Sequence, residues 1–378
     1  MTDQPLSILL AGDYPADPTL GSSKVFYKLQ EEFRARGHDC DIVFADEIGG
    51  PRNRQIRQAI APWSAAAAIQ RRLERKAYDV IDVASAEGLR LAVSRRRRFA
   101  VVSRSNGLEH LNYRRMLEDH DAGLVRKRWT RRIWYPLTRL SQVAMTARHA
   151  DRLLLLNEDD RRFAVERGWK RDDDIDVVPH GVSERLLNDP PSAGDRGQGL
   201  LFCASWDHMK GIAYLVRTFE RLHERGHALR LTILGPGVDP SVVLSAFEPR
   251  VRPFVRVIPR AAEPQVVEAY RNHDVLLWLS TYEGFGLVLL EAMSQGLAVV
   301  ATPVGCVPSL VRDGENGLVV PKRSPDAAVA AVERLMDAPE LRRSLGVAAR
   351  RAVSGMTWSQ TARRTLDVYA RAREARAA

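Results

Sequence analysis

Two carboxylates, Glu283 and Glu291, bracket a glycine turn in which several residue types suited to ligand binding come together. Glu283 stands in Tyr-Glu-Gly-Phe-Gly, a turn that ends at Gly286, and the apolar spacing beyond it predicts a helix that carries Glu291. The first amides of that helix, at Gly286 and Leu287, lack intrahelical acceptors and favour an anion such as a phosphate. Eight helical residues span about 12 Å. One carboxylate could therefore accept hydrogen bonds from a sugar and the other from a ribose.

Two apolar segments must position these residues. Residues 274–279 and 297–301 are typical of buried parallel strands, and Gly296 is placed to end the helix between them. Strand, turn, helix and strand form a βαβ unit, whose helix begins at the carboxyl edge of the sheet, where ligands bind. The sequence therefore predicts a phosphate-binding edge with a carboxylate on each side.

Glu, seven residues and Glu, with Gly-Phe-Gly after the first Glu, resembles the signature of the retaining glycosyltransferases of family 4, also called group 1. The resemblance covers nearly the whole chain and is most specific over 274–320. It implies the GT-B fold, an α/β architecture of two doubly wound, Rossmann-like domains facing across a cleft. It also implies a hexosyltransferase of glycan biosynthesis. Such an enzyme moves a sugar from a UDP- or GDP-sugar to an acceptor hydroxyl with retained configuration.

The chain of 378 residues is long enough for two domains. We expect an N-terminal acceptor-binding domain over 1–188 and a linker over 189–199, which is rich in Pro, Gly, Ser and Asp. A C-terminal domain that binds the nucleotide-sugar would follow over 200–357. The last helix, 358–378, resembles the one that returns to the first domain in this family.

Lys210 and Gly211 match the family's Lys-Gly pair, in which the Lys neutralises the donor diphosphate. Ser205 occupies the position of the Arg that usually precedes this pair. Arg260 is a candidate substitute cation, or a neighbour of the nucleotide base, and Gly21 lies in the loop that approaches the diphosphate from the first domain. The predicted donor-binding residues are Gly21, Ser205, Lys210, Arg260, Glu283, Gly284, Phe285, Gly286, Leu287 and Glu291.

No protein nucleophile is evident, so catalysis would rest on stabilising the departing diphosphate, while a donor phosphate oxygen takes the acceptor's proton, as proposed for the family. The family commonly has a His after the strand that precedes residue 104, where this chain aligns Asn106, and His110 lies one turn further on. Which of the two touches the sugar or the acceptor stays open. The predicted catalytic residues are Lys210, Glu283, Asn106 and His110. Asn106 and His180, which replaces Asn in a Pro-Asn-Gly-Val turn, are expected to border the acceptor side of the cleft.

The net charge of +10 is concentrated in residues 90–150, which hold 15 Lys or Arg and four acids. This indicates an acidic partner: anionic lipid, an acidic acceptor or nucleic acid. The predicted helix 124–140, kinked at Pro136, combines a basic face with an apolar stripe that includes Ile133 and Leu137. It could lie on an anionic membrane and serve a lipid-linked or cell-envelope acceptor, or pack its stripe on the sheet. The residues assigned to a membrane or acidic partner are Arg126, Lys127, Arg128, Trp129, Arg131 and Arg132.

Composition bounds the compartment and the cofactors. No apolar run approaches the ~20 residues that cross a bilayer, and the N-terminus lacks a signal-peptide layout. Three scattered cysteines indicate a reducing cytoplasm, with a peripheral position on the inner face of the membrane as the finer expectation. No acidic pair is expected to hold a diphosphate-bound metal, so we expect no metal and no cofactor, the nucleotide-sugar being a substrate.

Three other functions remain open. One is a different GT-B enzyme, a nucleotide-sugar epimerase or a phosphorylase. The second is a nucleic-acid binder that uses residues 90–150, although no recognition motif supports it and we expect no nucleic acid. The third is a catalytically silent sugar-binding module, which Ser205 and Asn106 make more credible.

Overall fold

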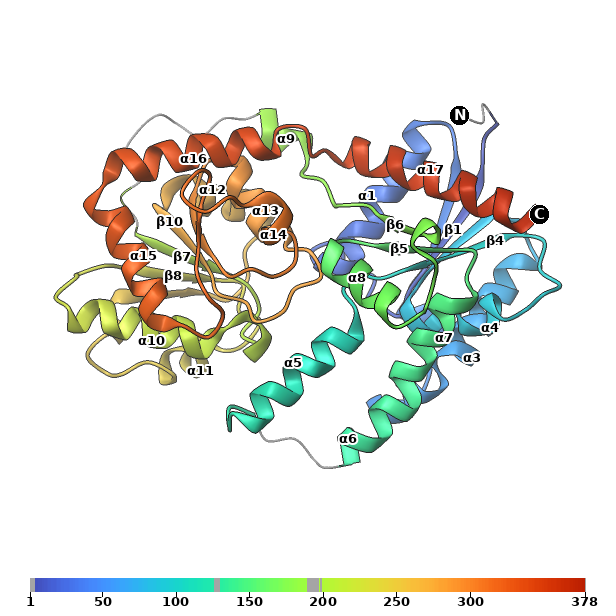
Figure 1. Ribbon diagram of the computed structural model, residues 1–378, viewed down its shortest axis with the longest axis horizontal. Helices are drawn as coiled ribbons and strands as arrows, with labels where there is room; N and C mark the ends of the chain where they lie inside the picture. The colour runs from blue at the N-terminus through green and yellow to red at the C-terminus, as the bar shows by residue number, and fades with distance from the viewer. Residues whose placement is uncertain (1–3, 126–129, 189–196, 198, 378) are drawn as a thin grey trace. The chain divides into compact units, whose positions relative to one another are not determined.

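The computed structural model describes residues 4–125, 130–188, 197 and 199–377 (Figure 1). The chain forms two compact units. Unit 1 comprises Met1–His180 and Trp358–Ala378, and unit 2 comprises Gly181–Thr357. Each unit contains one six-stranded parallel sheet with helices packed on it, which confirms the predicted α/β class.

The sheet of unit 1 has the strand order β2-β1-β3-β4-β5-β6. Its central strands β3 and β4 are buried at every residue, as expected where helices cover both faces of a parallel sheet. The strands are β1 (Ser7–Ala11), β2 (Asp39–Val43), β3 (Val80–Ala84), β4 (Ala100–Arg104), β5 (Arg152–Leu155) and β6 (Ile175–Val177). The longer helices are α1 (Gly21–Ala35), α3 (Arg54–Leu73), α5 (Glu109–Asp121), α6 (Thr130–Tyr135), α7 (Ser141–His149), α8 (Glu158–Glu166) and α17 (Trp358–Ala377). Short helical turns are α2 (Ala45–Ile48), η1 (Ser85–Gly88), α4 (Leu89–Ala92), the π-helical η2 (Pro136–Leu140) and η3 (Asp172–Asp174).

The sheet of unit 2 has the order β12-β11-β10-β7-β8-β9. From β7 the chain proceeds to one side through β8 and β9, and from β10 to the other side through β11 and β12. The crossovers therefore reverse between β7 and β10. Its strands are β7 (Leu200–Cys203), β8 (Leu231–Leu234), β9 (Val255–Ile258), β10 (Val275–Trp278), β11 (Ala298–Ala301) and β12 (Leu318–Val319). Its helices are α9 (Glu184–Asn188), η4 (His208–Lys210), α10 (Ile212–Glu224), α11 (Pro240–Ser245), η5 (Arg252–Phe254), α12 (Glu263–Asn272), α13 (Leu287–Ser294), α14 (Val307–Leu310), α15 (Pro325–Asp337) and α16 (Pro339–Val353).

Helix α17 packs on α1 and on strands β4 and β5 of unit 1, and Figure 1 shows it in red beside the blue α1. Its Tyr369 is fully buried and donates its hydroxyl hydrogen to Asp82 Oδ2 at 2.6 Å. Asp82 is also paired with Arg104 at 2.6 Å, and both side chains are inaccessible to solvent. Removing one partner of such a pair would leave a buried charge without a counter-ion. By donating to Asp82, Tyr369 of α17 adds a hydrogen bond to this buried ion pair of unit 1.

The boundary between the units differs from the predicted end of the first domain at residue 188. The structure places it after His180, because α9 packs on α13 of unit 2, where Gln295 Nε2 donates to the carbonyl oxygen of Leu186. Most of the predicted linker, 189–199, lies outside the described residues.

Candidate active site

The predicted glycine turn follows β10 and is held by backbone contacts. Gly286 has a φ of 112°, and a Cβ there would lie 2.7 Å from Trp278 Cζ2. Gly305, in the loop after β11, has a φ of 60°, and its Cβ would lie 2.3 Å from the carbonyl oxygen of Phe285. The same oxygen accepts the amide of Cys306 at 2.8 Å. Glycine is therefore required at two positions where the loops after β10 and β11 meet, and the turn carrying Glu283 has little freedom.

Lys210 and Glu283 form the centre of the site. Lys210 Nζ lies 2.7 Å from Glu283 Oε1, and Ser280 donates its hydroxyl to the same oxygen at 2.9 Å. Lys210 follows β7 and Glu283 follows β10, so the pair lies where the crossovers of the sheet reverse. In open parallel sheets this is the usual position of a ligand. The structure thus brings together two residues that lie 73 positions apart in the sequence.

Helix α13 begins beside this pair. Gly286 is its N-cap residue, and no acidic side chain occupies its first turn. The amides of that first turn lack intrahelical acceptors and carry partial positive charge. An anion can therefore be bound by these amides together with the ammonium of Lys210.

Glu291 lies one turn further along α13, half-buried, and accepts a hydrogen bond from Tyr270 of α12 at 3.1 Å. The helical rise places it roughly 6 Å beyond Leu287, the first residue of the helix. The two predicted carboxylates therefore lie on either side of the helix start, as the spacing in the sequence indicated.

Ser205 and Arg260 occupy less central positions. Ser205 is exposed and is followed by Trp206, whose ring packs against Phe202 and Phe247. Arg260 is exposed and follows β9, the edge strand. Two strand spacings of about 4.8 Å separate β9 from β7, so Arg260 lies roughly 10 Å from the strand that leads to Lys210. This position suits a contact to a nucleotide base better than a second contact to the same diphosphate.

In unit 1 the loops after β1 and β4 meet at the carboxyl edge of the sheet. Asn106 Nδ2 lies 3.4 Å from the hydroxyl oxygen of Tyr14, and Asn106 Oδ1 is buried with no partner among the described residues. His110 instead packs on Trp169, with ring centroids 4.6 Å apart. Burial lowers the pKa of His110 to about 4, so the ring is neutral at pH 7. The two candidates therefore have different surroundings. His110 Nδ1, like Asn106 Oδ1, is buried with no hydrogen-bond partner among the described residues, so each candidate leaves one polar atom unused.

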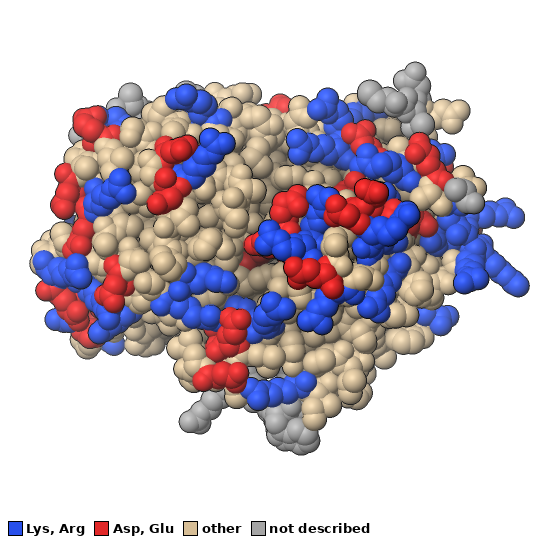
Figure 2. Space-filling view, in the orientation of Figure 1, with Lys and Arg blue, Asp and Glu red and all other residues tan. Residues whose placement is uncertain are grey.

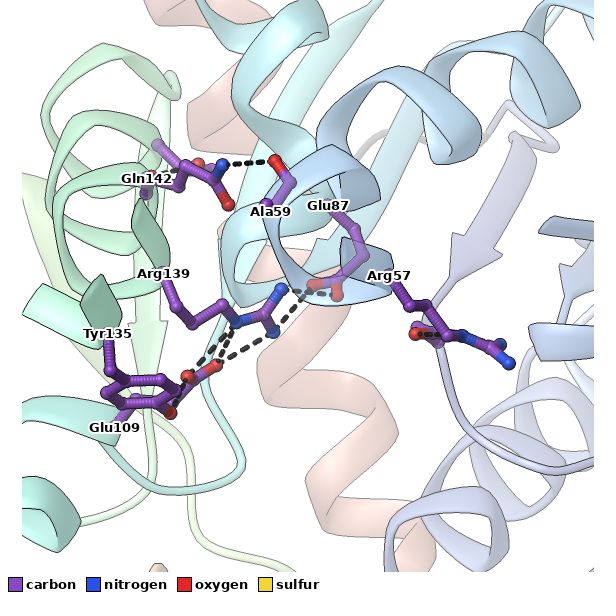
Figure 3. A network of polar contacts seen from close by, with 9 residues as sticks. Arg57, Ala59, Glu87, Glu109, Tyr135, Arg139 and Gln142 are labelled. Carbon is purple, nitrogen blue, oxygen red and sulfur yellow. Dashed lines mark hydrogen bonds and ion pairs between the residues drawn. The ribbon is translucent and has the colours of Figure 1, made fainter. Parts of the chain in front are cut away.

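Unit 1 also contains a network of charged side chains that the sequence did not predict (Figure 3). Arg139 stands between Glu87, at 2.8 Å, and Glu109, at 2.8 Å, and Tyr135 donates to Glu109 at 2.7 Å. Burial raises the pKa of Glu87, and Arg139 counteracts this effect. Glu87 lies three residues after the end of β3, and an acid so soon after a strand is a signal that could have been used. Its partner Arg139 comes from a π-helical turn, which no sequence pattern indicated.

Two further predicted residues have other surroundings. His180 is buried, packs on Trp358 with ring centroids 5.5 Å apart, and has its pKa lowered to about 3, first by burial and then by Arg104. The packing of His180 on Trp358 gives this residue a structural role. The predicted contact of His180 with an acceptor stays a prediction. Gly21 opens α1, and a Cβ there would meet nothing within 4 Å. Packing does not require glycine at this position.

The predicted basic helix corresponds to α6 and η2. Arg126, Lys127, Arg128 and Trp129 lie outside the described residues, as does the side chain of Arg131. Arg132 is paired with Asp121 at 2.6 Å. Ile133, Trp134 and Leu137 are 55%, 51% and 71% exposed, so the alternative in which this stripe packs on the sheet is wrong for Ile133 and Leu137.

Ion pairs neutralise part of the positive charge of residues 90–150. Within that segment Arg97, Arg104, Arg115, Arg132 and Arg139 are all paired with carboxylates. Figure 2 shows basic and acidic side chains interspersed over most of the face in view. Within the described part of the chain, no helix has the length and hydropathy to span a bilayer, and no group of three His, Cys, Asp or Glu could hold a metal ion.

The fold and the site define an α/β protein in which a helix start lies between two carboxylates, where the crossovers of a parallel sheet reverse. Residues 20–185 match the family described as Glycosyltransferase Family 4, and residues 191–352 match Glycosyl transferases group 1. The chain belongs to this family of glycosyltransferases, which are transferases of the EC 2.4 type, and has its GT-B fold.

Curated relatives agree with this assignment. A D-inositol 3-phosphate glycosyltransferase of Kineococcus radiotolerans is 34% identical over 256 residues, covering 61% of this chain and 59% of that protein. An MMP alpha-(1->4)-mannosyltransferase of Mycolicibacterium hassiacum is 30% identical over 263 residues, covering 67% of this chain and 62% of that protein. The matched segments therefore span about three fifths of these relatives' own lengths.

Solved structures share the fold. Sucrose-phosphate synthase from Thermosynechococcus elongatus superposes with a TM-score of 0.79 at 19% identity, covering 96% of this chain and 98% of that chain. The Anabaena protein HepE, in complex with UDP, superposes with a TM-score of 0.70 at 14% identity. The match covers 96% of this chain and 99% of that chain.

Proposed function

We propose that this chain transfers a sugar from a nucleotide-sugar, UDP- or GDP-linked, to an acceptor hydroxyl with retention of configuration. The observation that carries the proposal is the Lys210–Glu283 pair beside the start of α13, at the reversal between β7 and β10. A cation and a row of backbone amides suit a diphosphate, and adjacent carboxylates suit the hydroxyls on either side of it. HepE, with the same fold, was solved with UDP.

In the proposed reaction the bond between the anomeric carbon and the diphosphate oxygen breaks. A bond from the acceptor oxygen forms on the same face of the sugar, and a phosphate oxygen of the donor takes the acceptor's proton. Lys210 and the amides of α13 stabilise the charge that develops on the diphosphate. Glu283 binds the sugar and Glu291 the ribose. No metal or cofactor is part of the proposal.

The free protein already satisfies the charge of Lys210. At 2.7 Å from Glu283, the ammonium exchanges part of this contact for the diphosphate when the donor binds. Glu283, released from the ammonium, then becomes available to sugar hydroxyls. The pair therefore couples diphosphate binding to sugar binding.

Thermal unfolding with UDP, GDP and ADP, and then with sugar conjugates of the nucleotide that binds, tests the proposal. A ligand at 100 times its dissociation constant stabilises the folded state by about 2.7 kcal/mol. We expect one nucleotide to raise the Tm and Glu291→Ala to abolish the rise, with a strong increase of the donor KM. The absence of a shift with every nucleotide would contradict the proposal.

For the acceptor we propose a lipid-linked or cell-envelope glycan, bound at the unit-1 edge that carries Asn106. The exposed Ile133, Trp134 and Leu137 support a contact of unit 1 with an anionic membrane. We propose that the protein works in the cytoplasm, on the inner face of the membrane. The relatives named for D-inositol 3-phosphate indicate that a polyol phosphate is the first alternative to assay.

A further inference from the structure

Tyr270 is a buried phenol that the proposed reaction does not use. It lies in the last turns of α12, is fully inaccessible to solvent, and donates to Glu291 Oε2 at 3.1 Å. Cys203, the last residue of β7, places its Sγ 3.7 Å from the same hydroxyl oxygen. The hydroxyl therefore lies between the carboxyl end of β7 and helix α13.

The phenol must be the donor to Glu291. A hydroxyl has one hydrogen, and an ionised carboxylate can only accept. Burial, with Cys203 and Glu291 nearby, raises the pKa of Tyr270 well above its ordinary value, so the hydroxyl keeps its proton at any physiological pH. The thiol of Cys203 can then donate to the phenol oxygen, which gives a chain from β7 through Tyr270 to Glu291.

A second contact ties the same two helices together. Arg271, the neighbour of Tyr270, donates to Gln295 Oε1 at 3.0 Å, and Gln295 lies one turn after Glu291. The end of α12 is therefore linked to α13 at two successive turns. Of these two contacts, the one from Tyr270 is made directly to the carboxylate of Glu291.

We propose that Tyr270 is a positioning residue, which holds the Glu291 carboxylate in the orientation that receives the ribose of the donor. The inference rests on the proposed function, in which Glu291 binds that ribose. Loss of the phenol would remove one restraint on the carboxylate, and the entropy lost on fixing its orientation would then oppose each binding event. The effect should therefore appear in affinity for the ribose and not for the diphosphate.

The test compares binding of two ligands by calorimetry: the tightest of UDP, GDP and ADP, and inorganic pyrophosphate, which has no ribose. We expect Tyr270→Phe to weaken nucleotide binding roughly ten-fold and to leave pyrophosphate binding within about two-fold. Tyr369→Phe is the matched control, because Tyr369 is also a fully buried phenol that donates to a carboxylate, Asp82, but in unit 1. It should lower the Tm and leave both affinities unchanged.

A double-variant cycle with Glu291→Ala separates the inference from the proposed function. If Glu291→Ala leaves nucleotide affinity unchanged, the ribose role of Glu291 is wrong. If it weakens binding while Tyr270→Phe does not, the positioning role is wrong. We expect Tyr270→Phe to have no further effect in the Glu291→Ala background. Additive losses, or an equal loss for pyrophosphate, would show a general structural role and overturn the inference.

Discussion

Asp160 is a buried carboxyl whose pKa is raised mainly by burial. It lies in the first turn of α8, 1% exposed, and accepts the amide of Leu108 at 3.3 Å. Burial raises its pKa to about 7, and the amide hydrogen bond opposes this only in part. Since its pKa in the unfolded chain is about 3.9, the folded protein binds the extra proton. Stability is therefore highest below about pH 4 with respect to this group and falls as pH rises towards 7.

We expect Asp160→Asn to remove this dependence, because an amide can still accept the Leu108 amide and does not ionise. The difference in unfolding free energy between the variant and the parent should rise with pH, by at most about 1.4 kcal/mol per unit between pH 4 and 7. Urea denaturation at pH 5, 6, 7 and 8 measures it. Asp159→Asn, at an exposed neighbouring position, is the control. Parallel pH curves for Asp160→Asn and the parent would contradict the assignment.

At the scale of elements, the η4 turn is joined closely to the end of β10. The amide of Thr281 donates to the carbonyl oxygen of Met209 at 2.8 Å, and Gly211 has a φ of 77°. A Cβ at Gly211 would lie 2.0 Å from the carbonyl oxygen of Leu279. The loop that presents Lys210 therefore depends on glycine for two reasons, its left-handed backbone and its close approach to the strand.

We expect Gly211→Ala to destabilise the protein by more than about 2 kcal/mol, and to weaken nucleotide binding, because the loop must leave β10. Gly226→Ala is the matched control: its φ of 88° is similar, but nothing lies within 4 Å of the added Cβ. Gly226→Ala should lower the free energy of unfolding by only about 1 kcal/mol, the cost of a left-handed backbone for a residue with a Cβ. Thermal unfolding with and without nucleotide measures both. Equal effects of the two substitutions would show that the close approach to Leu279 is unimportant.

Local patterns predicted most of unit 2 and less of unit 1. The segment 274–301 is β10, α13 and β11 in the structure, because strand, turn and helix signals there lie within 30 residues of one another. His180, expected at an open edge, is buried because Trp358 returns from the far end of the chain to cover it. The contacts of Tyr270 and Arg139 could not be predicted either, because periodicity does not report which side chains pair with one another.

At the scale of the whole molecule, the exposed apolar residues of unit 1 bear on where the protein works. Figure 1 shows α6 extending away from the sheet of unit 1, and Ile133 and Leu137 on α6 and η2 are more than half exposed. Apolar side chains that stand near basic residues are typical of helices that enter the interface of an anionic bilayer.

We expect the parent protein to sediment with phosphatidylglycerol vesicles and much less with phosphatidylcholine vesicles, and binding to fall with salt. Replacing both Ile133 and Leu137 by Ser should weaken binding at least about ten-fold, since each buried aliphatic side chain contributes about 1.5–3 kcal/mol. Val347→Ser removes an equally exposed residue, 60% accessible, from α16 of unit 2. A similar loss in that control, or binding independent of lipid charge, would refute the membrane contact.

The return of α17 to unit 1 also bears on how the protein is made. Unit 2 is continuous in sequence, over Gly181–Thr357, whereas unit 1 needs Trp358–Ala378 to be complete. A ribosome, which releases the chain from its N-terminus, therefore delivers every residue of unit 2 before Tyr369 can reach Asp82. The nascent first 180 residues carry a buried pair, Asp82 and Arg104, that still lacks its third partner. The sheet of unit 1, although it is made before unit 2, is thus completed only by a helix that is made after unit 2.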